Sequence, residues 1–133
     1  MKVGYLLVIP VLKDIEVNEV SDGLKGFKLR CIAYIAEEED IGSDCFHFQV
    51  LSPEYVISYL SKDQNVLNGR ATFILQEFDL EMIKLEISKI LTDCIRPTWE
   101  EAAQAINRHL KWEYDSIKLL SENEVRSELN LNT

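Results

Sequence analysis

The stretch 45-CFHFQVLSPE-54 decides the fold, because it contains a strand that runs directly into the start of a helix. Apolar and polar residues alternate in its first half, so Phe46, Phe48 and Val50 should point to one side of a strand. Ser52 and Pro53 then form a helix start: a serine side chain can accept free backbone amides, and proline has no amide to leave unpaired. This junction predicts a sheet with helices packed against it.

The first half of the chain reads as strands. An apolar segment from Gly4 to Leu12, interrupted by Pro10, predicts the first strand, and no cleavage pattern follows it that would indicate a secretory leader. Phe27 to Ala36 predicts a second, long strand. The charged connection Glu37 to Ser43 then leads to the strand at Cys45 to Leu51. These two strands should form a hairpin with an acidic tip.

The second half reads mainly as helices. The helix after Ser52 should end near Ser61, with Val56, Ile57 and Leu60 on one face, and Arg70 to Glu77 predicts the next strand.

Two further helices and a last strand follow. Asp79 should cap a helix over Leu80 to Cys94, whose apolar residues recur at intervals of three and four. Thr98 and Glu101 have capping-box spacing and predict another helix, whereas Lys111 to Ile117 alternates and predicts the last strand.

The expected architecture is therefore a single α+β domain spanning residues 1–133. It should contain a mainly antiparallel sheet of about five strands packed against about three helices, in the order β-β-β-α-β-α-α-β. Residues 118–133 are expected to form a loose or short-helical tail. A chain of 133 residues is long enough to bury a core without a disulfide or metal.

Acidity is the main clue to a partner. The net charge of −9 disfavours nucleic acid and anionic membranes and favours a basic protein partner. Residues 37–69 hold seven acidic residues and one basic residue. Such a run can simply keep a hydrophobic strand soluble, or it can stand in for phosphates in a basic cleft. We expect the binding site for a partner at these carboxylates: Glu37, Glu38, Glu39, Asp40 and Asp44.

The sequence contains no recognisable catalytic constellation, metal site or cofactor motif. No glycine pattern that cradles phosphates is present, and the two histidines lack the spacing of metal ligands. Cys45 and His47 are neighbours on one strand, but no third residue is seen to orient them as a nucleophilic pair. Three widely spaced cysteines, Cys31, Cys45 and Cys94, indicate reduced thiols in the cytoplasm, and no apolar run is long enough to span a bilayer.

Several motifs together resemble the immunity protein 8 family of bacterial antitoxins, found in polymorphic toxin and contact-dependent inhibition systems. The motifs are Phe46 to Tyr55, Asn68 to Arg70, Pro97 to Ala102 and Lys111 to Tyr114, and the resemblance extends from Phe27 to Asp115. Six positions within or beside these motifs match the family, and we expect structural roles for them: Ser52, Pro53, Trp99, Glu100, Trp112 and Glu113. The acidic connection lies outside the family's motifs.

The resemblance implies a cytoplasmic, non-enzymatic inhibitor that binds one cognate toxin domain, often a nuclease, and needs no cofactor. Two alternatives remain open on the sequence alone. One is a small acidic regulatory or assembly module, which would associate through a sheet edge or exposed aromatic residues. The other is an enzyme that works with carboxylates and His47, which would require a pocket with perturbed pKa values. Self-association is not predicted either way.

Overall fold

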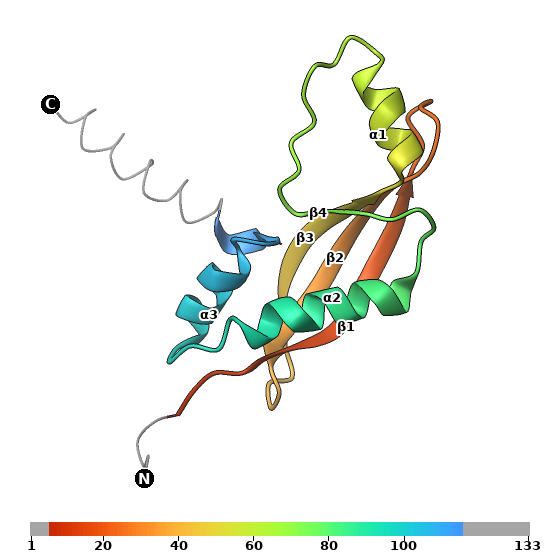
Figure 1. Cartoon of the computed structure of the whole chain (residues 1–133). Helices are drawn as coiled ribbons and strands as arrows, with labels where there is room; N and C mark the ends of the chain where they lie inside the picture. The colour runs from red at the N-terminus through yellow and green to blue at the C-terminus, as the bar shows by residue number, and fades with distance from the viewer. Residues whose placement is uncertain (1–5, 116–133) are drawn as a thin grey trace, which may run out of the picture.

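A mixed sheet of five strands carries the fold, and the computed structural model describes it within residues 6–115 (Figure 1). The elements are β1 (Pro10–Val20), β2 (Lys28–Glu37), β3 (Asp44–Leu51), α1 (Pro53–Leu60), β4 (Thr72–Ile74), α2 (Leu80–Thr92), α3 (Trp99–Ile106) and β5 (Lys111–Trp112). β1, β2 and β3 are antiparallel, whereas β4 pairs parallel and β5 antiparallel to β3. The predicted class, the mainly antiparallel sheet and the order of elements are confirmed. The expected tail, residues 118–133, lies outside the described residues.

The core lies on one face of the sheet, beneath α2 and α3 (Figure 1). On β3, Phe46, Phe48 and Val50 are buried and His47 is exposed, as the alternation predicts. The predicted helix after Asp79 is present, and the Asp79 side chain accepts the Met82 amide. This helix adds the buried residues of its inner face: Ile83, Ile87 and Leu91. The opposite face of the sheet is not covered by these helices.

α1 begins as predicted but buries a different side chain. The Ser52 hydroxyl accepts the Tyr55 amide at 3.1 Å and the Phe27 amide at 2.9 Å, so it joins the helix start to the beginning of β2. The apolar face formed by Val56, Ile57 and Leu60 is not buried in the core, since Ile57 is 67% and Leu60 is 42% exposed. α1 projects beyond the end of the sheet, so most of its surface has no layer to pack against (Figure 1).

Tyr55 holds α1 against the turn between β1 and β2. It is buried, and its hydroxyl donates to Asp22 Oδ2 at 2.6 Å. Burial and then this bond raise the pKa of Tyr55 to about 12, and the same bond lowers the pKa of Asp22. Gly26 lies close by at a φ of +78°, where a Cβ atom would run into the Ser52 hydroxyl and the Tyr55 amide. The turn can therefore approach the helix start because it has no side chain there.

The first strand lies later in the chain than predicted. β1 begins at Pro10, and of the preceding described residues Val8 forms one bridge to Arg96. A bulge between Leu12 and Asp14 explains the error. Leu12 and Ile15 pair with Ile35 and Ala33 of the buried face although they are three residues apart, and a bulge is needed to bring such a spacing onto one face. The bulge interrupts the alternation at Lys13, and Ile15 and Val17 resume it on the far side.

The last two strands are shorter than predicted. β4 keeps three of the residues expected between 70 and 77, and it pairs with β3 at Gln49 to Leu51. β5 keeps Lys111 and Trp112, which pair beside it on the same edge of β3, at His47 and Phe46. Residues 113–115 are helical rather than extended, and the end of that predicted strand lies outside the described residues. One edge of β3 is thus shared by two short strands.

Asp44, the first residue of β3, ties two elements to the sheet through one oxygen. Its Oδ2 accepts the indole N–H of Trp99 in α3 at 2.8 Å and that of Trp112 in β5 at 3.0 Å. Both rings also pack on Phe46, Trp99 edge-on and Trp112 stacked. Glu113 Oε1 accepts the Cys45 amide at 3.1 Å. We call Asp44, Trp99 and Trp112 the indole clasp.

The indole clasp should contribute measurably to stability. We expect Asp44→Ala to lower the free energy of unfolding by about 2 kcal/mol, because two half-buried indole donors lose their acceptor. Asp44→Asn should lose less, since its amide oxygen can still accept. Urea unfolding followed by tryptophan emission measures the change, with the exposed Asp40→Ala as the matched control, expected within about 0.5 kcal/mol of wild type. Equal losses for the two alanine variants would contradict a structural role for Asp44.

Candidate functional site

Four consecutive carboxylates form the turn between β2 and β3, and we call Glu37, Glu38, Glu39 and Asp40 the acidic tip. The last three are exposed and Glu37 is half-buried. The backbone of the turn is held by the bond from the Asp40 amide to the Glu37 carbonyl and by Lys13 Nζ, which donates to the Glu38 carbonyl at 2.7 Å. Within residues 6–115 no ion pair or side-chain hydrogen bond engages the four carboxylates. Their charges are therefore presented to solvent.

Apolar side chains lie beside the acidic tip. A hollow of about 410 Å³ is lined by the tip together with Leu6, Leu7 and Ile9. These three side chains are 86%, 56% and 56% exposed. An apolar patch bordered by charged groups is the usual composition of a protein-binding surface. The apolar run near the N-terminus was visible in the sequence, but its position beside the tip depends on the path of the chain before β1.

Asp44, which was grouped with the tip in the sequence, occupies a different environment. Its Oδ2 oxygen already accepts two indole N–H groups, and Glu113 is bonded to the adjacent Cys45 amide. Ser52 and Pro53 form the start of α1 at the other end of β3, and Glu100 is exposed in the first turn of α3. The structure thus brings Asp44, Trp99, Trp112 and Glu113 together near the tip and leaves Ser52 and Pro53 apart from them.

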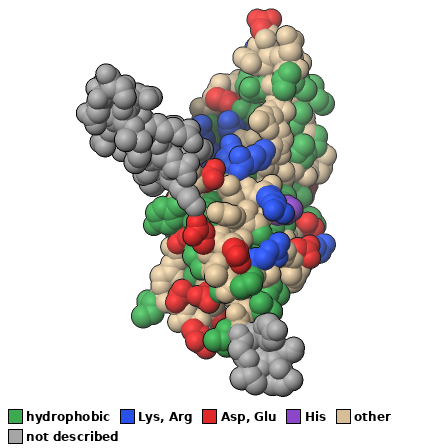
Figure 2. All heavy atoms as spheres, turned by 90° about the vertical axis from the view of Figure 1, so that its left-hand side faces the viewer, with side chains coloured by type: hydrophobic (Ala, Val, Ile, Leu, Met, Phe, Trp, Pro, Cys, Tyr) green, Lys and Arg blue, Asp and Glu red, His purple; other side chains and the backbone are tan. Residues whose placement is uncertain are grey.

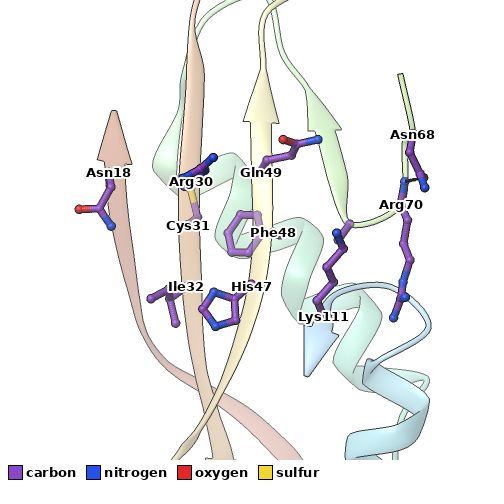
Figure 3. A pocket seen from close by; sticks show the side chains of 11 residues that line it. Asn18, Arg30, Cys31, Ile32, His47, Phe48, Gln49, Asn68, Arg70 and Lys111 are labelled. Carbon is purple, nitrogen blue, oxygen red and sulfur yellow. Dashed lines mark hydrogen bonds between the residues drawn. The ribbon is translucent and has the colours of Figure 1, made fainter. Parts of the chain in front are cut away.

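A second hollow, of about 410 Å³, lies on the sheet face that α2 does not cover, and no pattern in the sequence indicated it (Figure 3). Its basic lining residues are Arg30, His47, Arg70 and Lys111, which we call the basic face. They come from β2, β3, the loop before β4, and β5. Because each lies in a different segment, no linear motif contains them. Only the register of the sheet places them side by side.

The described residues contain no group of three or more potential metal ligands. A hydrogen bond from Asn18 lowers the pKa of Glu16, and one from Tyr55 lowers the pKa of Asp22. A carboxyl that acts as a general acid needs a raised pKa instead. Burial, and then the Glu113 carboxyl beside it, raise the pKa of the Cys45 thiol to about 11. Such a thiol is a poor nucleophile at neutral pH.

Alkylation can test whether Cys45 and His47 form a nucleophilic pair. With its pKa near 11, Cys45 should be about 0.1% thiolate at pH 8 and should react with iodoacetamide roughly a hundredfold more slowly than an unperturbed cysteine. Because burial and then the nearby Glu113 carboxyl raise the pKa of Cys45, His47→Ala should leave its alkylation rate unchanged. Peptide mass spectrometry resolves the rate for each cysteine. Fast labelling of Cys45 near pH 7 that His47→Ala abolishes would indicate an activated thiol instead.

Comparison with known proteins supplies the family. No helix within residues 6–115 is long and apolar enough to cross a membrane. No curated protein and no solved structure matches the chain. The family model described as Immunity protein 8 matches residues 12–117, which include every described strand and helix apart from the first two residues of β1. The chain therefore belongs to the immunity protein 8 family, and this membership implies an immunity protein that acts against a toxin.

Proposed function

We propose that this protein binds one cognate toxin domain in the bacterial cytoplasm and neutralises it without catalysis. The family match over residues 12–117 carries the proposal. The low-pKa carboxyls and the poorly nucleophilic Cys45 agree with an inhibitor that acts by binding. We further propose that the toxin is a basic domain, with a nuclease as the first expectation, because a cleft that binds phosphates must carry positive charge.

The acidic tip is the surface that we assign to this contact. It combines carboxylates that face solvent with exposed apolar side chains at Leu6, Leu7 and Ile9. The charges can accelerate encounter with a basic partner, and the apolar residues can add contact area that is buried in the complex. Carboxylates presented on a turn can also occupy positions that substrate phosphates would take. Asp44 would support this surface by fixing the start of β3 through the indole clasp.

Rescue from a toxin is the direct test of function. Co-expression with the toxic C-terminal domain encoded by the adjoining gene should restore growth, and the two proteins should purify together. A catalytically inactive toxin domain provides the control for binding without toxicity. Equal killing with and without this protein, together with no co-purification, would show that the immunity function is wrong.

The acidic tip should set the rate of association. Replacing Glu37, Glu38 and Glu39 by Gln and Asp40 by Asn should slow association with the toxin domain by about tenfold at low salt, because steering by charge is lost. The difference should shrink as the Debye length falls from about 10 Å at 0.1 M salt to about 3 Å at 1 M. Stopped-flow or surface plasmon resonance at several salt concentrations measures both effects.

A matched variant separates the position of the charges from their number. It removes four carboxylates elsewhere, at exposed positions: Glu19→Gln, Glu54→Gln, Asp63→Asn and Glu77→Gln. This control should slow association much less than the tip variant. If both variants slow association equally, net charge alone attracts the toxin and the tip has no special part in binding.

A further inference from the structure

The basic face is unexpected in a chain with 23 acidic and 14 basic residues. Three of the fourteen Lys and Arg residues line its hollow together with His47, and no Asp or Glu lines it. Figure 2 shows several Lys and Arg side chains gathered in the middle of one side of the molecule, with Asp and Glu side chains beside them and toward both ends. Positive charge is thus concentrated at one place on an acidic protein.

Sheet register builds this face from two neighbouring rows of side chains. In one row Arg30 pairs with Asn18 on β1 and with Gln49 on β3. In the next row His47 pairs with Ile32 on β2 and with Lys111 on β5. Alternation along a strand places both rows on the same side of the sheet, away from the buried Phe46 and Phe48 row. Figure 3 shows these side chains around the hollow.

Two of the three cations can receive a partner. Within residues 6–115 Arg30 and Lys111 make no ion pair or side-chain hydrogen bond, and both are exposed. Arg70 is fixed instead: its Nη2 donates to the Asn107 carbonyl at 2.8 Å and to Asn107 Oδ1 at 3.2 Å. A guanidinium such as that of Arg30 matches a carboxylate or phosphate in shape, and an ammonium such as that of Lys111 adds a mobile donor.

The surroundings favour a short anionic segment over a long polyanion. Glu16 on β1 lies beside Ile32 on β2, and its carboxylate accepts hydrogen bonds from Asn18 and Tyr34. The acidic tip lies at the end of the β2–β3 hairpin. An extended nucleic acid would have to pass these carboxylates with a phosphate at each nucleotide, and it would be repelled by the net charge of −9. One or two Asp or Glu side chains fit the hollow of about 410 Å³ on the side of Arg30 and Lys111, while Glu16 borders it on the side of Asn18.

We propose that the basic face receives aspartate or glutamate side chains of the cognate toxin, so that the toxin is bound at two surfaces of opposite charge. The inference rests on the proposed function, because it assigns a second contact to the same partner. Arg30 and Glu37 are seven residues apart on β2, which is about 23 Å along a strand. A typical interface covers about 800 Å² on each partner, enough for one toxin domain to contact both surfaces.

Charge reversal at Arg30 and Lys111 tests the proposal by the sign of its effect. If the toxin were attracted only as a basic protein, Arg30→Glu with Lys111→Glu would make this chain more acidic and tighten binding. We expect the opposite: the dissociation constant for the toxin domain should rise by about tenfold or more, because carboxylates would face carboxylates. The neutral variant Arg30→Gln with Lys111→Gln should weaken binding by a smaller factor. Isothermal titration calorimetry measures all three proteins.

A second charge reversal at a distance provides the control. Lys25→Glu with Lys62→Glu makes the same change in net charge at exposed positions outside the hollow, and it should bind as tightly as wild type or slightly more tightly. Thermal unfolding of each variant checks that it folds, and the neutral variant serves if the reversed one does not. Unchanged or tighter binding by the Arg30 and Lys111 variants, while wild type still neutralises the toxin, would overturn this inference and leave the proposed function standing.

Two other occupants give different results and would also overturn the proposal. If nucleic acid is the ligand, a 20-nucleotide single-stranded DNA should bind wild type at physiological salt and lose binding on charge reversal. If the acidic tip of a second copy is the ligand, sedimentation should show a wild-type oligomer that charge reversal disperses. Absence of both effects, with weaker toxin binding, supports an acidic segment of the toxin. Failure of wild type to neutralise the toxin at all would instead reject the proposed function.

Discussion

The register of β3 against its neighbours is the constraint on which the rest of the structure depends. Its even-numbered residues from 46 to 50 enter the core beneath the helices, so His47 and Gln49 between them must face the uncovered side. The same strand pairs with β2 on one edge and with β4 and β5 on the other. A slip of one residue would expose Phe46 and Phe48 and bury His47. Burial of the phenylalanines therefore also fixes the composition of the basic face.

In the indole clasp, one acidic residue, Asp44, has a structural role instead of presenting its carboxylate to solvent. Asp44 follows the tip by four residues, and in the sequence it belongs to the same acidic run. In the structure its oxygen joins α3 and β5 to the start of β3, and Phe46 packs against both tryptophans. Trp99 and Trp112, which lie 13 residues apart in the sequence, thus meet at Asp44. The indole clasp lies next to the turn that carries the acidic tip. The packed aromatic residues and the exposed carboxylates are therefore at the same end of the β2–β3 hairpin.

Local patterns in the sequence predicted local structure well. Caps at Ser52, Asp79 and Thr98 gave the helix starts, because each cap depends on residues within one turn. β1 was predicted too early in the chain, since the apolar run before Leu12 was taken for the strand, whereas the strand continues past a bulge at Lys13 to Val20. The exposed face of α1 was also missed, because its burial depends on where the helix lies relative to the sheet rather than on its own periodicity.

The two candidate surfaces also differ in whether the sequence alone could locate them. The acidic tip is continuous in sequence, so composition alone could locate it. The basic face draws Arg30, His47, Arg70 and Lys111 from segments up to 81 residues apart, and only the pairing of β3 with β2 and β5 brings them together.

The acidic tip and the basic face place opposite charges on one protein, so its electrostatic attraction differs between long range and contact. At long range the net charge of −9 dominates, so a basic protein is attracted and an acidic one is repelled. In the two-surface contact that we propose, a partner within a Debye length of about 8 Å would meet the tip and the basic face separately. A uniformly basic surface would match the tip but would place its cations against Arg30 and Lys111. Long-range attraction would then select partners by their net charge, whereas contact would select them by the arrangement of their charges. The second selection would let an inhibitor distinguish one toxin from other basic proteins.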